Sequence, residues 1–199
     1  AKLVRCTDKS LGEKNQSLKL DALVFLRECI RHHSAAACQP LLPYLVPVMV
    51  AAAADEWYKT IAEALRLASA IVTVLRPTST LSAPYDATLA DQFAVPIYEA
   101  IFSRLDVVDI DQEIKECSIV AIGVLLSHLG DHPHLKAQLP AVLALVRRRL
   151  ENETTRIASL KTLQQIASSI LNLDLRAFCE STGAELAPFL RQTHQSSRL

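Results

Sequence analysis

The sequence contains little of the material from which sheets and phosphate-binding loops are built. Glycine occurs at only four of 199 positions and aromatic residues make up 5% of the chain, while 50% of the residues are hydrophobic. Strands favour aromatic and β-branched side chains, and phosphate loops need several glycines close together, so both are disfavoured. Alanine and leucine, which recur throughout, are strong helix formers. The composition therefore predicts a folded, all-α protein.

The chain also lacks an excess of either charge and any long apolar run. Lysine plus arginine and aspartate plus glutamate each number 21, so no net field attracts nucleic acid or an anionic membrane. The longest apolar stretch, Tyr44 to Ala54, contains Pro47 and is much shorter than a bilayer-spanning helix. We expect no nucleic-acid partner and no membrane partner. Residues Ala1 to Val4 have neither an initiator methionine nor a signal-peptide core, which predicts a trimmed fragment of a longer chain.

The five cysteines are odd in number and widely spaced. They predict neither a disulfide framework nor a Cys-x-x-Cys metal site, and they favour a reducing compartment, the cytoplasm or the nucleus. A cysteine nucleophile needs a base and an orienting group, and no such constellation accompanies Cys29, Cys38 or Cys117. We therefore expect small core thiols, no cofactor and no enzymatic activity.

What the chain does contain is an internal repeat with a period near forty residues. Its anchor is a basic residue followed three positions later by a small one, and it occurs at Lys19 with Ala22, Lys59 with Ala62, Lys115 with Ser118, and Arg156 with Ser159. The anchors are 40, 56 and 41 residues apart. The long interval holds a Pro- and Ser-rich stretch, which predicts an exposed loop insertion near residues 77–88. Apolar residues return at helical spacing behind each anchor, so each anchor lies in a predicted first helix.

A second helical pattern follows each first helix and carries a proline, at Pro47, Pro96, Pro140 and Pro188. Short acceptor side chains precede three of the first helices as predicted N-caps, at Asp55, at Asp109 or Asp111, and at Asn152. A helix pair of this kind cannot bury both faces alone, but stacked pairs share a continuous core. We predict a single α-solenoid fragment over residues 1–199, with about four HEAT-type antiparallel helix pairs. Other repeats of the parent solenoid are expected as neighbours at both ends.

The densest group of potential metal ligands consists of His128, Asp131, His132 and His134, and a His-x-His pair can share an ion such as zinc. These residues lie at a predicted turn between two helices, where polar side chains are commonly exposed, and no second cluster completes a tetrahedral set. We assign no metal site, and a metal-dependent enzyme is the remote alternative.

Arginines near the ends of the second helices are the candidates for partner binding: Arg104, Arg147, Arg148, Arg149 and Arg191. Second helices commonly line the concave face of a solenoid, where these cations would meet an acidic surface. The competing interpretation is that cations at a helix C-terminus are solvated and favour the helix dipole. The anchor basic residues are expected to bridge neighbouring repeats instead.

The wording of the repeats resembles that of the cullin-associated and neddylation-dissociated proteins. The clearest stretch is Asp111–Cys117, and further similar stretches follow the same order along the chain: Asp8–Ser10, Leu18–Phe25, Tyr58–Thr60, Glu63–Leu65, Arg76–Pro77, Asn152–Glu153 with Thr155–Arg156, and Asp174–Arg176. The resemblance spans nearly the whole chain and corresponds to the middle of a longer solenoid. Departures from the family's wording cluster at Ala35–Ala37, Ala51–Ala54 and His132–His134.

The resemblance implies a function in protein binding. Members of this family wrap around cullin scaffolds that lack the ubiquitin-like modifier and help exchange the substrate receptors of cullin-RING ubiquitin ligases. The implied partners are a cullin and its RING subunit. A HEAT scaffold of another system, such as a phosphatase scaffold or a transport receptor, is the alternative that physical arguments leave open.

Overall fold

The computed structural model describes residues 15–80 and 87–183, and all regular secondary structure within these ranges is helical. In chain order the longer helices are α2 (Gln16–His32), α4 (Leu42–Ala53), α5 (Tyr58–Leu75), α6 (Ala87–Leu105), α7 (Gln112–Leu129), α8 (Pro133–Glu151) and α9 (Glu153–Ala167). Short segments α3 (Ala35–Cys38), η1 (Gln39–Leu41) and η2 (Thr78–Thr80) connect them, and residues 176–183 are also helical. The predicted all-α fold is confirmed.

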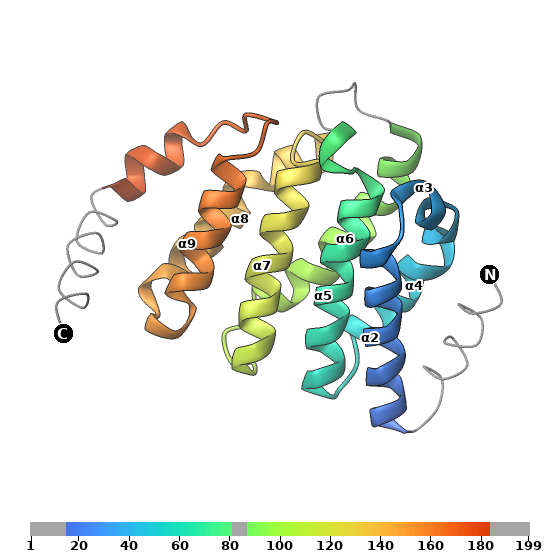
Figure 1. The fold of residues 1–199 in the computed structure, drawn as a ribbon. Helices are drawn as coiled ribbons and strands as arrows, with labels where there is room; N and C mark the ends of the chain where they lie inside the picture. Colours follow the sequence, from blue (N-terminus) through green and yellow to red (C-terminus); the bar gives the residue numbers. More distant parts are fainter. Residues whose placement is uncertain (1–14, 81–86, 184–199) are drawn as a thin grey trace, which may run out of the picture.

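The helices form two layers (Figure 1). The first helices α2, α5, α7 and α9 pack side by side in one layer, and the second helices α4, α6 and α8 follow one another in the other. Each second helix also packs on the first helix of the next repeat, as α4 does on α5, α6 on α7 and α8 on α9. This arrangement is the predicted α-solenoid of HEAT-type helix pairs.

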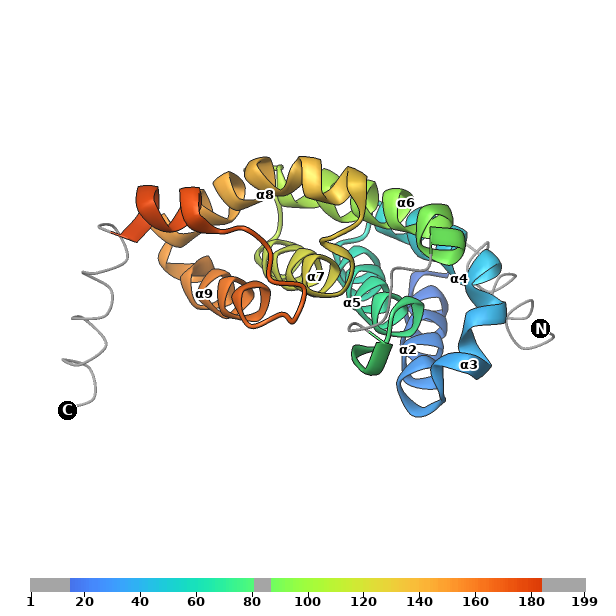
Figure 2. The same ribbon diagram turned by 90° about the horizontal axis from the view of Figure 1, so that it is seen from above.

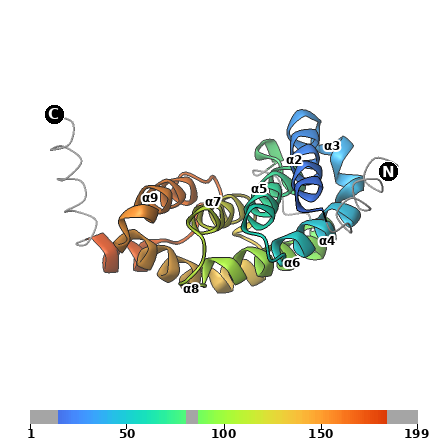
Figure 3. The same ribbon diagram turned by 90° about the horizontal axis from the view of Figure 1, so that it is seen from below.

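The layers curve together (Figures 2 and 3), with the second helices along the outer side and the first helices along the inner side. The expectation that the second helices line the concave face is therefore wrong for this segment. The first helices contact one another more extensively than the second helices do. Since closer spacing shortens the first-helix layer, the stack bends toward it.

Small buried residues allow this close spacing. The small member of each repeat anchor is buried, with Ala22 at 7% exposure and Ala62, Ser118 and Ser159 at 0%. A Cβ atom on Gly123 of α7 would lie 2.8 Å from Cγ2 of Thr162 on α9, so this crossing requires a residue without a side chain. The repeat found in the sequence thus marks the contacts between successive first helices.

Two of the anchor basic residues bridge neighbouring repeats as predicted. Lys19 pairs with Asp55 at 3.2 Å, and Arg156 donates from Nε to the carbonyl of Leu150 at 3.1 Å. Burial by itself raises the pKa of Asp55, but hydrogen bonds from the Trp57 N–H and from Lys19, together with the charge of Lys19, leave that pKa below its usual value. Lys59 instead lies over the ring of Trp57, 5.7 Å from its centroid, and makes a local contact.

Helix ends follow the predicted capping chemistry with one shift. Asp111 caps α7 by accepting a hydrogen bond from the Glu113 N–H at 2.8 Å, and Asn152 caps α9 by accepting from the Thr154 N–H at 3.0 Å. Asp55 accepts from the Trp57 N–H at 2.9 Å but lies two residues before Trp57, the residue at the N-cap position of α5. Side chains with short acceptors therefore define where these first helices begin.

The prolines of the second helices lie inside α4, α6 and α8, at Pro47, Pro96 and Pro140, while Pro188 lies outside the described residues. The segment Ala35–Ala53 is helical for longer than its apolar core predicted, and its length and composition are those of a membrane-spanning helix. Its apolar side chains have another explanation, because Leu42, Leu45 and Met49 are buried in the core where α4 packs on α5 and α6.

The loop insertion is described only in part. Residues 78–80 form the exposed turn η2, and α6 begins at Ala87. Residues 81–86 lie outside the described part of the chain, so the predicted exposure of the insertion is met for its first residues only. The insertion separates α5 from α6, which lengthens the second repeat without changing the order of the layers.

Candidate partner-binding surfaces

Two of the candidate arginines cap the preceding second helix. Arg104, near the end of α6, donates from Nε to the carbonyl of Ala53 at the end of α4, at 2.8 Å. Arg149, near the end of α8, donates from one guanidinium nitrogen to the carbonyls of Leu105 and Val107 beyond the end of α6, at 2.7 and 2.6 Å. The same bond thus recurs in successive repeats, and it satisfies carbonyls that the helix itself leaves without donors.

The burial of Arg149 changes its assignment. Its side chain is part of a residue only 6% exposed, and burial, helped by the neighbouring charge of Arg148, lowers its pKa below the usual arginine value. A guanidinium in this position is unavailable to a partner, so Arg149 is a structural residue and the prediction of partner binding was wrong for it. Arg104 is half-buried and has the same type of bond.

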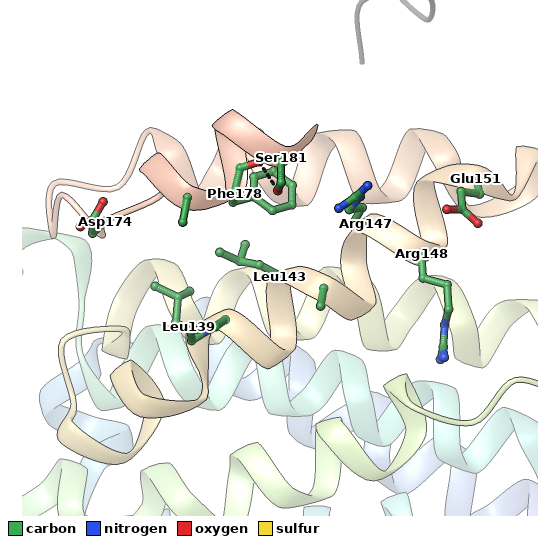
Figure 4. Close-up of a pocket in the computed structure, with 11 residues that line it drawn as sticks. Leu139, Leu143, Arg147, Arg148, Glu151, Asp174, Phe178 and Ser181 are labelled. Atoms are coloured by element: carbon green, nitrogen blue, oxygen red, sulfur yellow. Dashed lines mark hydrogen bonds between the residues drawn. The ribbon is translucent and has the colours of Figure 1, made fainter. Parts of the chain in front are cut away.

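The remaining described candidates, Arg147 and Arg148, border a groove between α8 and residues 176–183 (Figure 4). The groove has a volume of about 460 Å³. The side chain of Arg148 is 48% exposed and lies 3.6 Å from the carboxylate of Asp106. Figure 4 shows Arg147 on the side of Phe178 and Arg148 directed away from it. Arg191 lies outside the described residues.

Apolar side chains form the floor of this outer groove. Leu139 and Leu143 from α8 face Phe178 across it (Figure 4), and Asp174 stands at one end. The carboxylate of Asp174 is held by the guanidinium of Arg176 at 2.7 Å, which lowers the pKa of Asp174 far below its usual value. An apolar floor beside cationic side chains suits a protein segment that carries apolar and acidic residues.

The histidine cluster has a structural role that the sequence did not predict. Arg76, 7% exposed, donates to the His128 carbonyl at 3.1 Å and pairs with Asp131, while the Nδ1–H of His128 donates to the carbonyl of Arg76 at 2.7 Å. His132 caps α8 by accepting from the His134 N–H at 3.2 Å, and its Nε2 lies 3.1 Å from Asp91.

These contacts correct the expected exposure of the turn, because His128 and His132 are only 8% and 6% exposed. They also give the imidazoles partners other than a metal ion. Within residues 15–80 and 87–183, no group of three or more histidine, cysteine, aspartate or glutamate side chains is placed to hold a metal.

Ion pairs that sequence inspection missed cross the inner layer. Arg27 of α2 pairs with Glu63 of α5, and Arg66 of α5 pairs with Glu113 of α7 at 2.6 Å. Glu63 is 3% exposed, and Arg66 also reaches it at 3.3 Å. These carboxylates help raise the pKa of Arg66 despite its partial burial. Helical spacing placed these residues on one face, but only the packing of the first helices brings the opposite charges together.

The fold and the two exposed sides of the stack define an α-solenoid of the protein-binding class, with grooves between helices in place of an enclosed reaction site. Comparison with known families agrees with this class. The chain belongs to the family described as CAND1-like, TPR repeats, whose model matches residues 2–122. Anchor spacings of 40 and 41 residues correspond to units of HEAT length, since TPR units are about 34 residues long.

Several relatives match over nearly the whole chain. Cullin-associated NEDD8-dissociated protein 1 of Arabidopsis thaliana is 37% identical over 198 residues, and that of Drosophila melanogaster is 34% identical over 192 residues. Cullin-associated NEDD8-dissociated protein 2 of Mus musculus is 36% identical over 189 residues. The matches cover 98%, 96% and 93% of this chain but only 16%, 15% and 14% of the relatives, so the chain spans a small part of their length.

Proposed function

We propose that the chain is a cullin-binding scaffold segment and that it acts within a longer solenoid as part of a substrate-receptor exchange factor for cullin-RING ligases. The observation that carries the proposal is the similarity, over 93–98% of the chain, to proteins named as cullin-associated and NEDD8-dissociated. The partners are a cullin without the modifier, its RING subunit, and further repeats of the parent solenoid. The cytoplasm and the nucleus are the proposed locations.

The structure supports a role in binding through its distributed surface. A solenoid places its contacts along many repeats, so four repeats supply only part of the contact area. We assign the outer groove between α8 and residues 176–183 as the contact within this segment, with Arg148 as its exposed cation. Affinity of the isolated segment for a cullin should fall well below that of a complete relative.

The alternatives are less well supported. A phosphatase scaffold or a transport receptor would also be an α-solenoid, but the family match favours the cullin-associated proteins. A metal-dependent enzyme would need histidines free to bind an ion, whereas His128 and His132 are buried in contacts with Arg76 and Asp91.

Charge reversal of Arg148 tests the assignment. Binding of the chain to an unmodified cullin–RING complex is measured by surface plasmon resonance at low and moderate salt. We expect Arg148→Glu to lower the association rate about three- to tenfold at low salt and less at moderate salt, because exposed charges mainly steer encounter. The matched control is Lys136→Glu, which reverses an exposed cation on the same helix outside the groove.

The outcomes separate the parts of the proposal. Equal kinetics for wild type, Arg148→Glu and Lys136→Glu would remove the outer groove from the interface. No binding of the wild-type chain to the complex, at concentrations where a complete relative is saturated, would contradict cullin binding by this segment. Thermal unfolding of each variant shows whether the fold is retained, and we expect no change because both side chains are exposed.

A further inference from the structure

The grooves between successive first helices differ in how they are closed. The α2–α5 groove is crossed by the Arg27–Glu63 pair, and the α5–α7 groove by the Arg66–Glu113 pair. The α7–α9 groove has polar bridges near its two ends only. Thr154 donates to the side chain of Gln112 at 3.0 Å at one end, and Thr162 donates to the Ile119 carbonyl at 2.9 Å at the other.

Between these bridges lies a cavity of about 490 Å³, the inner groove. Cys117 and Val120 of α7 face Ile157 and Ala158 of α9 along it, and Lys161 follows one turn after Ile157. The small Cys117 and Ala158 side chains leave the space unfilled, while Val120 and Ile157 are 45% and 66% exposed at its edges. Exposed β-branched side chains beside a cavity are surfaces that gain from being covered.

The wall at Cys117 is uncharged. Burial raises the pKa of this thiol to about 11, with the nearby carboxylates acting in the same direction and Arg66 opposing them. The thiol therefore stays protonated near neutral pH and behaves as a small apolar side chain rather than as a nucleophile. The inner groove thus offers packing rather than covalent chemistry.

Charges around the inner groove are committed on one side and open on the other. Arg66 is shared between Glu63 and Glu113, and Glu116 accepts a hydrogen bond from Gln112 at 2.7 Å. Lys161 is exposed, and the structure places no hydrogen-bond acceptor or carboxylate of the described residues at its ammonium group. A ligand covering the apolar edges would therefore bring its own carboxylate to Lys161.

We propose that the inner groove is a docking site for a short segment of a partner protein. The segment inserts one large apolar side chain between Cys117 and Ala158 and places a carboxylate beside Lys161. A volume of about 490 Å³ suits one or two side chains, and pockets of roughly 300–1,000 Å³ are typical of such sites. The lining contains no aromatic ring and a single uncommitted cation, which disfavours nucleic acid.

Synthetic peptides test this docking site. One twelve-residue peptide carries a central leucine flanked by glutamates, and a matched peptide carries lysines in place of the glutamates. Methyl NMR of the 199-residue chain follows the signals of Val120 and Ile157 during titration. We expect the acidic peptide to shift both signals with a Kd on the order of millimolar or tighter, and the basic peptide to leave them unchanged.

Two variants sharpen the test. Ala158→Leu fills the cavity and should weaken the acidic peptide about tenfold or more, a loss of about 1.4 kcal/mol. Lys161→Glu should reverse the preference in favour of the basic peptide, and because Lys161 is exposed this variant keeps its fold even where Ala158→Leu does not. Lys136→Glu on α8 is the control and should leave both titrations unchanged.

The proposal is overturned by three results: no shift with either peptide, equal shifts with both, or an unchanged preference in Lys161→Glu. The readout is independent of cullin binding, because it uses peptides and methyl groups of the inner layer. Peptide binding without binding to the cullin–RING complex would therefore contradict the proposed function and leave the docking site standing. The reverse pair of results would do the opposite.

Discussion

Arginine is rarely buried in proteins, because its guanidinium loses water that several acceptors must replace. At Arg149 the acceptors are the carbonyls of Leu105 and Val107, which lie just past the end of α6 and have no helical donor of their own. The side chain therefore satisfies two groups at once and ties the end of α8 to the end of α6. Arg104 repeats this bond one repeat earlier, toward Ala53.

Replacing Arg149 should destabilise the fold. Arg149→Met keeps most of the apolar stem but removes the donors to Leu105 and Val107, so we expect the free energy of unfolding to fall by about 2–3 kcal/mol. Urea unfolding followed by circular dichroism measures the change. Arg148→Met, at the exposed neighbouring position, should change the stability by less than about 0.5 kcal/mol. Equal losses in the two variants would contradict the structural assignment of Arg149.

At the scale of elements, the crossing of α7 and α9 depends on a single glycine. Gly123 has ordinary helical surroundings, and alanine at an unhindered helix position would stabilise by about 0.5–1 kcal/mol. Here the added Cβ meets the Thr162 side chain, with Cγ2 at 2.8 Å and Oγ1 at 3.1 Å. Thr162 is held by its hydrogen bond to the Ile119 carbonyl, so it cannot rotate away without losing that bond.

We therefore expect Gly123→Ala to destabilise the protein by about 1–2 kcal/mol in spite of the better helix propensity. Thr162→Ser keeps the hydroxyl and removes Cγ2, so in that background Gly123→Ala should be close to neutral. A double-mutant cycle on the unfolding free energies measures this coupling. Additive effects of the two substitutions would show that the helices do not approach as closely as described.

At the scale of the whole molecule, stability should vary along the stack. α5 and α7 lie between first helices on both sides and bury 13 and 11 of their residues, whereas α9 buries four. Within residues 176–183 only Thr182 is buried. In a solenoid each repeat is stabilised by its neighbours, so the elements with two neighbours should open least often.

Native-state hydrogen exchange measures this gradient residue by residue. We expect the backbone amides of α5 and α7 to exchange most slowly, those of α9 faster, and those of residues 176–183 fastest. Addition of denaturant should lower the protection of residues 176–183 and α9 before that of α5. Uniform protection along the chain would instead indicate a single cooperative unit without the expected dependence on neighbours.

Much of this architecture could be predicted from sequence because its causes are local. Helix periodicity, the N-caps Asp111 and Asn152, and the small residues three positions after each anchor all act within one or two turns. Arg147, Arg148 and Arg149 could not be separated in the same way. Successive residues on a helix point about 100° apart, so three adjacent arginines face three directions. Which direction meets α6 depends on the packing of α8.

The sequence by itself therefore determined the helical class, the order of first and second helices, and the period of the stack, because these depend on residue type and spacing along one chain. Only the tertiary structure decided the side toward which the stack curves, the partners of Arg76 and Arg149, and the open groove beside Ala158. Each of these depends on atoms contributed by helices some 35 to 55 residues apart, as with Arg76 and Asp131. Their distances are set by how closely whole helices approach, which no local pattern specifies.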